Sequence, residues 1–256
     1  MHRFFVENLA EGEGRLPASE AHHAAHVLRL KPGDDVELFD GRGGAAGGRI
    51  VSVCRGEVAL AVGPVRRRDE PDGRRVHLAF AVPKGKRLDW LLEKATELAA
   101  ASLQPVAFER SVAAGPAGRA AWDRWRGHCV AAAKQCGLDR LPELHEPAPL
   151  PDFLAGCEAA VRLLGDADVG ADPPARPLAR VLNAPQSEFR NPNSVVPHPE
   201  SAISLLVGPE GGLTPEERPA CVAAGFAPVR LGRTTLRIET AAVALLAAVV
   251  GLTDGT

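Results

Sequence analysis

The sequence predicts an α/β protein with two domains, a small all-β domain at residues 1–72 and a larger domain at residues 73–256. Short segments of alternating polar and apolar residues follow one another in the first domain, which is typical of a small β-barrel. A charged stretch at 66–75 separates the domains, either as a solvated connector or as a strap that contacts phosphates. From residue 76 on, apolar runs alternate with helical patterns, as they do where a parallel sheet is built from strand–helix units.

The first domain is expected to contain strands at 35–39, 49–53 and 57–62. Five glycines between Asp40 and Ile50 predict a turn and then a flexible tip. Upstream, a short helix at the edge of the barrel is expected to carry His22, His23 and His26. Because no cysteine or acid is spaced to complete a ligand set with these histidines, we expect no metal site.

The second domain is expected to begin with a strand at 76–82 and a helix whose apolar residues include Leu88, Leu91 and Leu92. A strand at 103–108, a helix at 119–136 and a strand at 161–164 are expected to follow. We interpret Trp122 and Trp125 on the second helix as core or interface residues.

The most informative feature is the glycine-rich loop Gly208-Pro209-Glu210-Gly211-Gly212, which follows an apolar run at 203–207. The run suits a buried parallel strand, and the glycines permit positive φ and a close backbone approach to a ligand. Thr214 and Glu217 predict a capping box at the start of a helix that ends near Gly225. The loop lacks the Gly-Lys-Ser/Thr of a P-loop, and the glycines alone would also fit a plain strand-to-helix turn.

A second loop begins at Leu231, after an expected strand at 226–231. It leads through Arg237 and Glu239 into an expected helix at 240–252, which is apolar on every side and too short to span a membrane. Charged side chains at the mouth of a buried helix are costly unless they pair or bind a ligand. Two such loops are what an α/β protein uses to hold a polar small molecule beyond its strand ends.

Together the two loops resemble the SPOUT superfamily of S-adenosylmethionine-dependent methyltransferases. More narrowly, they resemble the bacterial family that methylates N3 of a uridine in 16S ribosomal RNA. Residues 208–212 match that family's Gly-Pro-Glu-Gly-Gly, and residues 231–241 match its Leu-Gly-x-x-x-Leu-Arg-x-Glu-Thr-Ala. Shorter matches from Arg3 to Gly137 extend the resemblance over nearly the whole chain.

The resemblance implies a C-terminal α/β methyltransferase domain tied as a trefoil knot, preceded by a PUA-like β-barrel domain that binds RNA. It implies S-adenosyl-L-methionine as the cofactor and a homodimer with the active site near the interface. Arg237 is the implied candidate for stabilising or orienting the uracil anion, and Glu239 for orienting Arg237 or capping the last helix. The implied cofactor-binding residues are Leu164, Gly165, Leu206, Val207, Gly208, Pro209, Glu210, Gly211, Gly212, Leu231, Gly232, Leu236 and Thr240.

The charge distribution predicts where RNA would bind. Residues 77–140 carry 10 basic and 6 acidic side chains, whereas the net charge of the whole chain is −2, which is unlike a generic nucleic-acid binder. The basic first turn of the helix after Gly85 opposes the helix dipole, a conflict that a bound anion would relieve. The candidate contacts to 16S ribosomal RNA or the small ribosomal subunit are Arg29, Lys84, Lys86, Arg87 and Arg110.

The cysteines and the N-terminus predict a cytoplasmic protein. Five scattered cysteines without a C-x-x-C spacing favour free thiols in a reducing compartment. The N-terminal stretch turns acidic at Glu7, which is unlike a signal peptide, and no 18-residue apolar run predicts a membrane span.

Four residues depart from the family pattern, namely Lys134, Leu138, Arg233 and Thr234, and a loop at 183–201 is longer than expected. These departures fall at expected substrate-side positions, so they leave open a relative with the same cofactor pocket and another acceptor, such as a small molecule. A non-catalytic RNA-binding protein with the same fold is a further alternative. The intact motifs at 208–212 and 236–240 argue against that alternative.

Overall fold

The computed structural model describes residues 1–67, 75–111, 118–168, 170–182 and 202–253. The chain divides into two compact units, one formed by Met1–Pro71 with Cys129–Leu141 and the other by Asp72–His128 with Pro142–Thr256. Residues 129–141, which no sequence pattern placed with the N-terminal part, therefore belong to the first unit. Most of the charged connector and the long loop at 183–201 lie outside the described residues.

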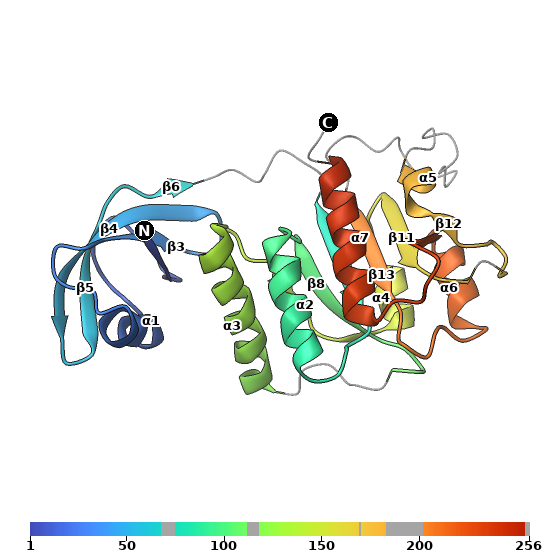
Figure 1. The fold of residues 1–256 in the computed structure, drawn as a ribbon, viewed down its shortest axis with the longest axis horizontal. Helices are drawn as coiled ribbons and strands as arrows, with labels where there is room; N and C mark the ends of the chain where they lie inside the picture. Colours follow the sequence, from blue (N-terminus) through green and yellow to red (C-terminus); the bar gives the residue numbers. More distant parts are fainter. Residues whose placement is uncertain (68–74, 112–117, 169, 183–201, 254–256) are drawn as a thin grey trace. The chain divides into compact units, whose positions relative to one another are not determined.

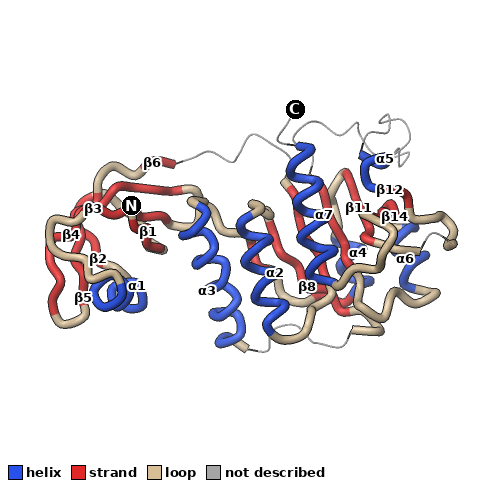
Figure 2. The backbone as a smooth tube through the Cα atoms, in the orientation of Figure 1, coloured by secondary structure: helices blue, strands red, loops and turns tan. Residues whose placement is uncertain are grey.

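The first unit is built on a six-stranded sheet in the order β1-β3-β4-β5-β2, with β6 beside β4 (Figure 2). β1 runs parallel to β3, and the other pairs are antiparallel. The expected strands at 35–39 and 57–62 are confirmed. The strands are β1 (His2–Phe5), β2 (Gly12–Arg15), β3 (Asp35–Phe39), β4 (Gly44–Cys54), β5 (Glu57–Val62) and β6 (Arg66–Arg67).

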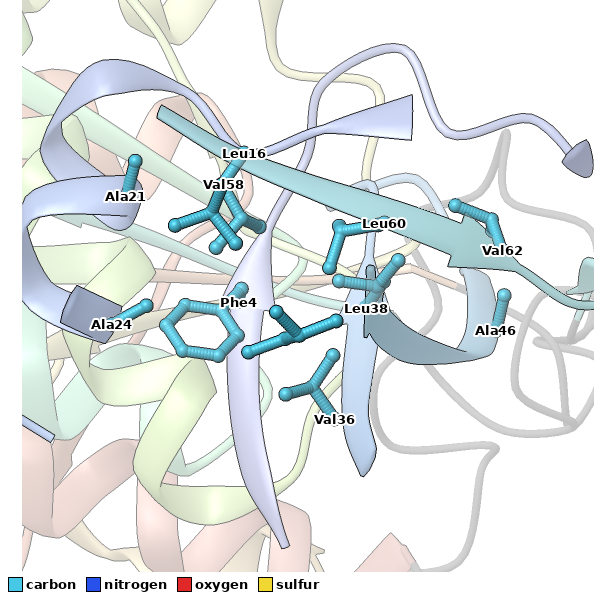
Figure 3. Packing of buried hydrophobic residues seen from close by; sticks show 11 residues of the cluster. Phe4, Leu16, Ala21, Ala24, Val36, Leu38, Ala46, Val58, Leu60 and Val62 are labelled. Carbon is cyan, nitrogen blue, oxygen red and sulfur yellow. The ribbon is translucent and has the colours of Figure 1, made fainter. Parts of the chain in front are cut away.

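Alternation along these strands produces the core of the first unit. In β5, Val58, Leu60 and Val62 are buried while the residues between them are more exposed. They pack with Phe4 of β1 and Leu38 of β3 in one apolar cluster (Figure 3). The period of two in the sequence therefore explains which side chains of β5 are buried.

The glycine-rich stretch after Asp40 is not a flexible tip, contrary to the expectation from sequence. Residues 44–54 form one long strand, β4. A Cβ on Gly44 would lie 2.4 Å from Asp40 Oδ2, and one on Gly48 would lie 3.1 Å from Leu38 Cδ1. The buried carboxylate of Asp40 accepts hydrogen bonds from the backbone N–H groups of Arg42 and Gly44. Close packing, rather than flexibility, explains these glycines.

The histidine segment forms helix α1 (Ala18–His22), continued by the π-helical turn η1 (His23–Val27). A helix was expected here, and the structure confirms it. Within the described ranges, no three His, Cys, Asp or Glu side chains are grouped as the ligands of a metal ion would be.

Helix α3 (Arg119–Cys136), which has the bounds expected from sequence, contributes its C-terminal part to the first unit. Lys134 Nζ lies 2.7 Å from Glu20 Oε2 and over the ring of Phe4. Leu138, just beyond the helix, packs in a small apolar cluster with Phe39. Lys134 and Leu138 were expected at substrate-side positions, but both contribute to the packing of this unit.

The second unit is built on an eight-stranded sheet in the order β10-β8-β7-β13-β11-β14-β12, with β9 beside β8. All of these pairs are parallel. β13 is buried along its whole length, as its apolar run predicts. The strands are β7 (Val76–Phe80), β8 (Ser102–Ala107), β9 (Glu143–Leu144), β10 (Ala148–Pro149), β11 (Val161–Gly165), β12 (Arg176–Pro177), β13 (Ile203–Val207) and β14 (Ala227–Arg230).

Helices α2 and α7 lie side by side, and α7 packs on β7, β11 and β13 (Figure 1). α7 begins at Ile238, so Glu239 lies within its first turn. The helices of this unit besides the start of α3 are α2 (Lys86–Glu97), α4 (Leu150–Gly156), α5 (Leu178–Leu182), α6 (Glu217–Ala223) and α7 (Ile238–Thr253). A span of the bilayer would need a longer apolar helix than any in the described part of the chain.

The expectation that the last helix is buried on every side is wrong. Ala242, Leu246 and Val249 of α7 are buried, but Ala247 and Gly251 are exposed. The sheet and α2 cover part of the circumference only, so an apolar strip on α7 stays open to solvent in the single chain.

Candidate cofactor site

The site lies at the carboxyl ends of three neighbouring strands, β13, β11 and β14. Gly165 at the end of β11 is level with Val207 in β13 and with Val229 in β14. The loops that follow the three strands therefore begin at one edge of the sheet. Loops at the carboxyl ends of parallel strands are where α/β proteins bind ligands.

These loops enclose a cavity of about 610 Å³. This volume lies within the range of about 300–1,000 Å³ that is usual for small-molecule sites. Three segments form its walls: the glycine loop at 208–213, the loop at 231–236 and the loop that starts at Gly165. Leu245 of α7 also lines the cavity. A Cβ on Gly165 would lie 2.8 Å from Leu245 Cδ1, so a side chain at this position would collide with α7.

Most residues named from the sequence as cofactor contacts line this cavity, namely Gly165, Val207, Gly208, Pro209, Glu210, Gly212, Leu231, Gly232 and Leu236. Four others do not reach its wall. Leu164 and Leu206 are fully buried one residue before the strand ends. Gly211 faces Arg110, and Thr240 lies on α7 at an exposed position.

The glycine loop is fastened at its end by the capping box expected from sequence. The Thr214 hydroxyl accepts a hydrogen bond from Glu217 N–H at 3.1 Å, and Glu217 Oε2 accepts one from Thr214 N–H at 3.0 Å. Glu217 Oε1 also accepts a hydrogen bond from the backbone N–H of Glu109 at 2.7 Å, beyond the end of β8. Helix α6 ends at Ala223, and Gly225 with φ 85° follows its C-cap, close to where the sequence predicts the end.

Two arginines bond to the middle of the same loop. Arg110 Nη1 donates to the carbonyl of Gly211 at 3.0 Å and lies 3.4 Å from that of Leu213. Arg87 Nη1 lies 2.6 Å from Glu210 Oε1. The anion expected at the basic first turn of α2 is thus supplied by the chain itself, as the carboxylate of Glu210.

The loop at 231–236 has few internal contacts. All of its residues are exposed, and Leu231 and Leu236 each retain 37% of their surface. No backbone hydrogen bond to a described residue is made by the N–H groups of residues 232–236. Arg230 Nη1 donates to the carbonyl of Gly232 at 3.2 Å.

Arg237 and Glu239 differ in their surroundings. Arg237 is exposed, and its guanidinium has no hydrogen bond or ion pair with a described residue. Glu239 is 8% exposed, and its Oε2 atom has no hydrogen-bond partner in the described part of the chain. A buried carboxylate oxygen without a partner is costly, which marks the start of α7 as a place where a further donor would be favourable.

The third wall, the loop that starts at Gly165, contains two acids that were not among the residues named as cofactor contacts. Asp166 and Asp168 both line the cavity. Asp166 is held by Arg218 of α6, whose Nε lies 2.8 Å from Asp166 Oδ2, and both side chains are 12% exposed. Arg218 also donates to the carbonyls of Asp172 at 3.1 Å and Pro173 at 2.6 Å. The sequence did contain a signal for these residues, because two acids follow directly after the strand at 161–165.

The walls fit S-adenosyl-L-methionine. An adenine ring would cover the exposed side chains of Leu231 and Leu236, and the unpaired N–H groups of 232–236 offer donors to its nitrogens. Asp166, Asp168 and Glu210 place carboxylates on the wall. Asp166 and Glu210 are paired with Arg218 and Arg87, whereas Asp168 has no ion pair with a described residue and suits a ligand with a sulfonium and an ammonium group. These features belong to this chain and do not depend on any relative.

Among the basic residues named as RNA contacts, Lys84 and Lys86 are exposed at the start of α2. Lys84 borders a small hollow of about 10 Å³ that shares Pro209, Glu210 and Ile238 with the main cavity. Arg29 is exposed in the first unit, where it has φ 55° after η1. Arg87 and Arg110 are the two residues that bond to the glycine loop.

Comparison with known proteins agrees with this site. The RNA methyltransferase domain family matches residues 70–250, and the RNA methyltransferase PUA domain family matches residues 16–62. A ribosomal RNA small subunit methyltransferase E from Mycobacterium bovis is 31% identical over 98% of this chain and 92% of its own.

Two solved structures have the same fold over the whole chain. The ribosomal RNA small subunit methyltransferase E of Neisseria gonorrhoeae, bound to S-adenosyl methionine, is 29% identical with a TM-score of 0.82, and all of both chains is covered. A methyltransferase from Legionella pneumophila with bound SAM is 25% identical with a TM-score of 0.80, covering 98% of this chain and 96% of the other.

The fold and the cavity at its strand ends are thus those of an α/β methyltransferase with an N-terminal PUA domain. The chain belongs to the RNA methyltransferase family and, within it, to the ribosomal RNA small subunit methyltransferase E group. The family resemblance stated from the two loops is confirmed.

Proposed function

We propose that this protein transfers a methyl group from S-adenosyl-L-methionine to N3 of a uridine in 16S ribosomal RNA. The observation that carries the proposal is the cavity that both motif loops enclose at adjacent strand ends. Membership of an RNA methyltransferase family and similarity to structures that hold the cofactor support it.

The cofactor is held by the three walls. In this proposal two loops bind the cofactor through backbone groups: the glycine loop at 208–212 and the loop with Leu231, Gly232 and Leu236. Gly165 and Val207 at the strand ends complete the binding site. Leu164 and Leu206 act from the layer beneath by placing these strand ends. The fastened glycine loop and the strand ends, together with the loop at 231–236 once the cofactor orders it, can hold the methyl group in line with the acceptor nitrogen.

The cofactor supplies an electrophilic methyl group on a sulfonium, so the chain's own task is to make N3 of the base nucleophilic. The N3 proton passes to solvent water, which leaves a negative charge delocalised over the uracil ring. Arg237 is exposed beside the cavity loop with no described partner, so its guanidinium can donate to that anion. Glu239 positions Arg237, since its unpartnered Oε2 can accept one of the remaining guanidinium N–H groups.

The proposal includes two finer features of the fold. The loops at 208–214 and 231–237 are threaded as a trefoil knot, which is supported by strand order, since β11 lies between β13 and β14 although it precedes both in the chain. The six-stranded sheet of residues 1–72 closes as a PUA-like barrel and docks RNA, supported by the PUA family match at 16–62. Residues 73–128 and 142–256 then form the catalytic domain, since residues 129–141 belong to the first unit.

The active protein is a homodimer in this proposal. The support is an apolar surface on the second unit: Ala247 and Gly251 of α7 are exposed, and Trp90 of the neighbouring α2 is 41% exposed. Large exposed aromatic side chains next to an apolar helix face are typical of protein interfaces. Light scattering would show a single species of twice the chain mass, and Trp90→Glu would shift it towards the monomer.

RNA contacts in the proposal are made by Arg29, Lys84 and Lys86, which are exposed and carry charge towards solvent. The five cysteines are all free thiols, which supports a cytoplasmic site of action. No metal takes part in the proposed reaction.

The experiment that tests the proposal uses purified protein, labelled S-adenosyl-L-methionine and small ribosomal subunits that lack the N3-methyluridine. After digestion to nucleosides, the expected product is labelled N3-methyluridine, lost with Arg237→Ala. Tight cofactor binding without labelled RNA would refute the ribosomal substrate and favour a small-molecule acceptor. Absence of cofactor binding would favour a non-catalytic RNA-binding protein.

A further inference from the structure

Arg110 occupies a position where its side chain lies against the glycine loop. Its Nη1 group donates to the carbonyl of Gly211 at 3.0 Å and approaches that of Leu213 at 3.4 Å. A Cβ on Gly211 would lie 3.4 Å from Arg110 Cβ and 3.6 Å from its Cδ. The stem of the arginine therefore packs on the α-carbon of Gly211 while its head bonds the backbone on both sides of Gly212.

Two more contacts reach the same loop from the same side. Arg87 in the first turn of α2 pairs with Glu210 at 2.6 Å. The backbone N–H of Glu109, next to Arg110, donates to Glu217 at the start of α6. The loop segment from 210 to 217 is thus attached at three points to chain that is more than one hundred residues earlier in sequence.

We propose that Arg110, assisted by Arg87, is a positioning residue of the cofactor loop and not a ligand of RNA phosphate. Ordering a flexible residue costs about 1–2 kcal/mol, and a loop with several glycines has much freedom to lose. Bonds that order the loop before binding remove this cost from the binding step, which raises affinity for whatever the loop holds. The inference rests on the proposed function, because the affinity at issue is that for S-adenosyl-L-methionine.

The neighbouring lysines provide the contrast. Lys84 and Lys86 are exposed and make no hydrogen bond or ion pair with a described residue. Their ammonium groups are available to a phosphate, whereas Arg110 and Arg87 already have partners on the loop. Cofactor binding should therefore depend on the arginines, and RNA binding on the lysines.

The test compares Arg110→Ala and Arg110→Lys with the control Lys86→Ala in the full-length protein. Calorimetry with S-adenosyl-L-methionine gives the dissociation constant of the cofactor. Filter binding gives the dissociation constant of unmethylated small ribosomal subunits. We expect Arg110→Ala to weaken cofactor binding about tenfold with RNA affinity unchanged, since lost hydrogen bonds to charged groups have effects of this size. Lys86→Ala should show the reverse pattern.

Steady-state kinetics separates the two roles further. Arg110→Ala should raise the KM for the cofactor and leave the KM for subunits unchanged. Arg110→Lys should recover part of the loss, because lysine keeps the charge and a donor but lacks the longer, planar guanidinium that lies against the loop. If Arg110→Ala instead lost RNA affinity and bound the cofactor normally, the inference would be overturned. If the unaltered protein bound no S-adenosyl-L-methionine, the proposed function itself would fail, and the inference with it.

Should Arg110→Ala fail to fold, Gly211→Val gives the same comparison. A Cβ alone would stand at ordinary van der Waals distance from the Arg110 stem, 3.4 Å from Cβ and 3.6 Å from Cδ, but the branched side chain of valine extends beyond that point and would move the arginine from the loop without removing its charge. Cofactor affinity should again fall while RNA affinity stays constant. An unchanged cofactor affinity in this variant would contradict the inference.

Discussion

The two motif loops of the cavity differ in how they are held. The glycine loop at 208–214 is fastened by Arg87, Arg110 and the capping box of Thr214 and Glu217. The loop at 231–236 is exposed throughout, and its only described side-chain bond comes from Arg230. Both follow strands of the same sheet, so the difference lies in what surrounds each loop and not in the strand before it.

Helix α6 explains part of this difference. Its first residue, Glu217, fastens the glycine loop, and its second, Arg218, fastens the loop after Gly165 through Asp166. The loop at 231–236 has no such attachment to α6 among the described residues. The glycine loop and the loop after Gly165 are therefore ordered before a ligand binds, whereas the loop at 231–236 depends on the ligand for most of its contacts.

The largest expected loss of stability comes from the loop after Gly165, which Arg218 holds. Arg218→Met removes a partner from Asp166 in a pair that is 12% exposed on each side. Leaving one member of a buried pair uncompensated should lower the free energy of unfolding by about 3 kcal/mol. Urea denaturation measures this free energy of unfolding. The double variant Arg218→Met with Asp166→Asn should recover part of the lost stability, because no unpaired charge remains.

The next largest loss of stability is expected at the end of the glycine loop, where the capping box lies. Glu217→Ala leaves the backbone N–H groups of Thr214 and Glu109 without their acceptor, so we expect a loss of about 2 kcal/mol. Thr214→Ala, which removes one side of the capping box, should lose about 1 kcal/mol. Equal stability of the Glu217→Ala variant and the unaltered protein would show that the loop is not fastened in this way.

Cys221 reports on the same region. It is fully buried in α6, and burial raises the pKa of its thiol to about 12, so thiol reagents should not modify it in the folded protein. Modification of Cys221 by iodoacetamide, followed by peptide mass spectrometry, should become faster in Glu217→Ala, with exposed Cys54 as the internal reference.

The open loop should behave in the opposite way. Leu236 is 37% exposed, so Leu236→Ala should change the free energy of unfolding by less than about 0.5 kcal/mol. Its affinity for S-adenosyl-L-methionine should nevertheless fall about five- to tenfold, because the ligand would cover the missing methyl groups. Thermal unfolding with and without cofactor measures both quantities; a large loss of stability without cofactor would mean that this wall is ordered on its own.

A smaller coupling is expected between Arg87 and Glu210. Their side chains are 39% and 44% exposed, so solvent screens the pair, and a double-mutant cycle with Arg87→Ala and Glu210→Gln should give about 0.5 kcal/mol. The coupling should fall further at 1 M salt. A coupling that is zero at low salt would leave Arg110 as the only arginine that holds the loop.

A pH titration provides a perturbation away from the cavity. His77 lies near the start of β7, with Nδ1 2.7 Å from Ser102 Oγ, and its pKa is lowered from 6.5 chiefly by burial, with Arg75 and His145 adding to the effect. Below pH 6.5 the unfolded chain therefore binds a proton that the folded chain does not, so stability falls as pH falls through this range. His77→Gln should flatten that slope, while cofactor affinity, set at the other edge of the sheet, should not depend on the substitution.

Much of the local structure follows from the sequence because it depends on near neighbours. The period-two pattern of β5, the apolar run of β13, the capping box at Thr214 and Glu217 and the glycine at the end of α6 all act within a few residues, and each was found where the pattern places it. The glycine run in β4 was misread because packing against Asp40 and Leu38 cannot be seen along the chain.

The sequence by itself determined the family, the two motif loops and most of the secondary structure, since these rest on short-range patterns and residue identity. The tertiary structure alone decided which walls of the cavity are fastened. From the sequence, Arg87 and Arg110 were expected to contact RNA and Arg218 had no assigned role. Only the fold brings the three to Glu210, Gly211 and Asp166. A bond between distant residues depends on the path of the whole chain, and that path is fixed by packing of the sheet and its helices rather than by any local pattern.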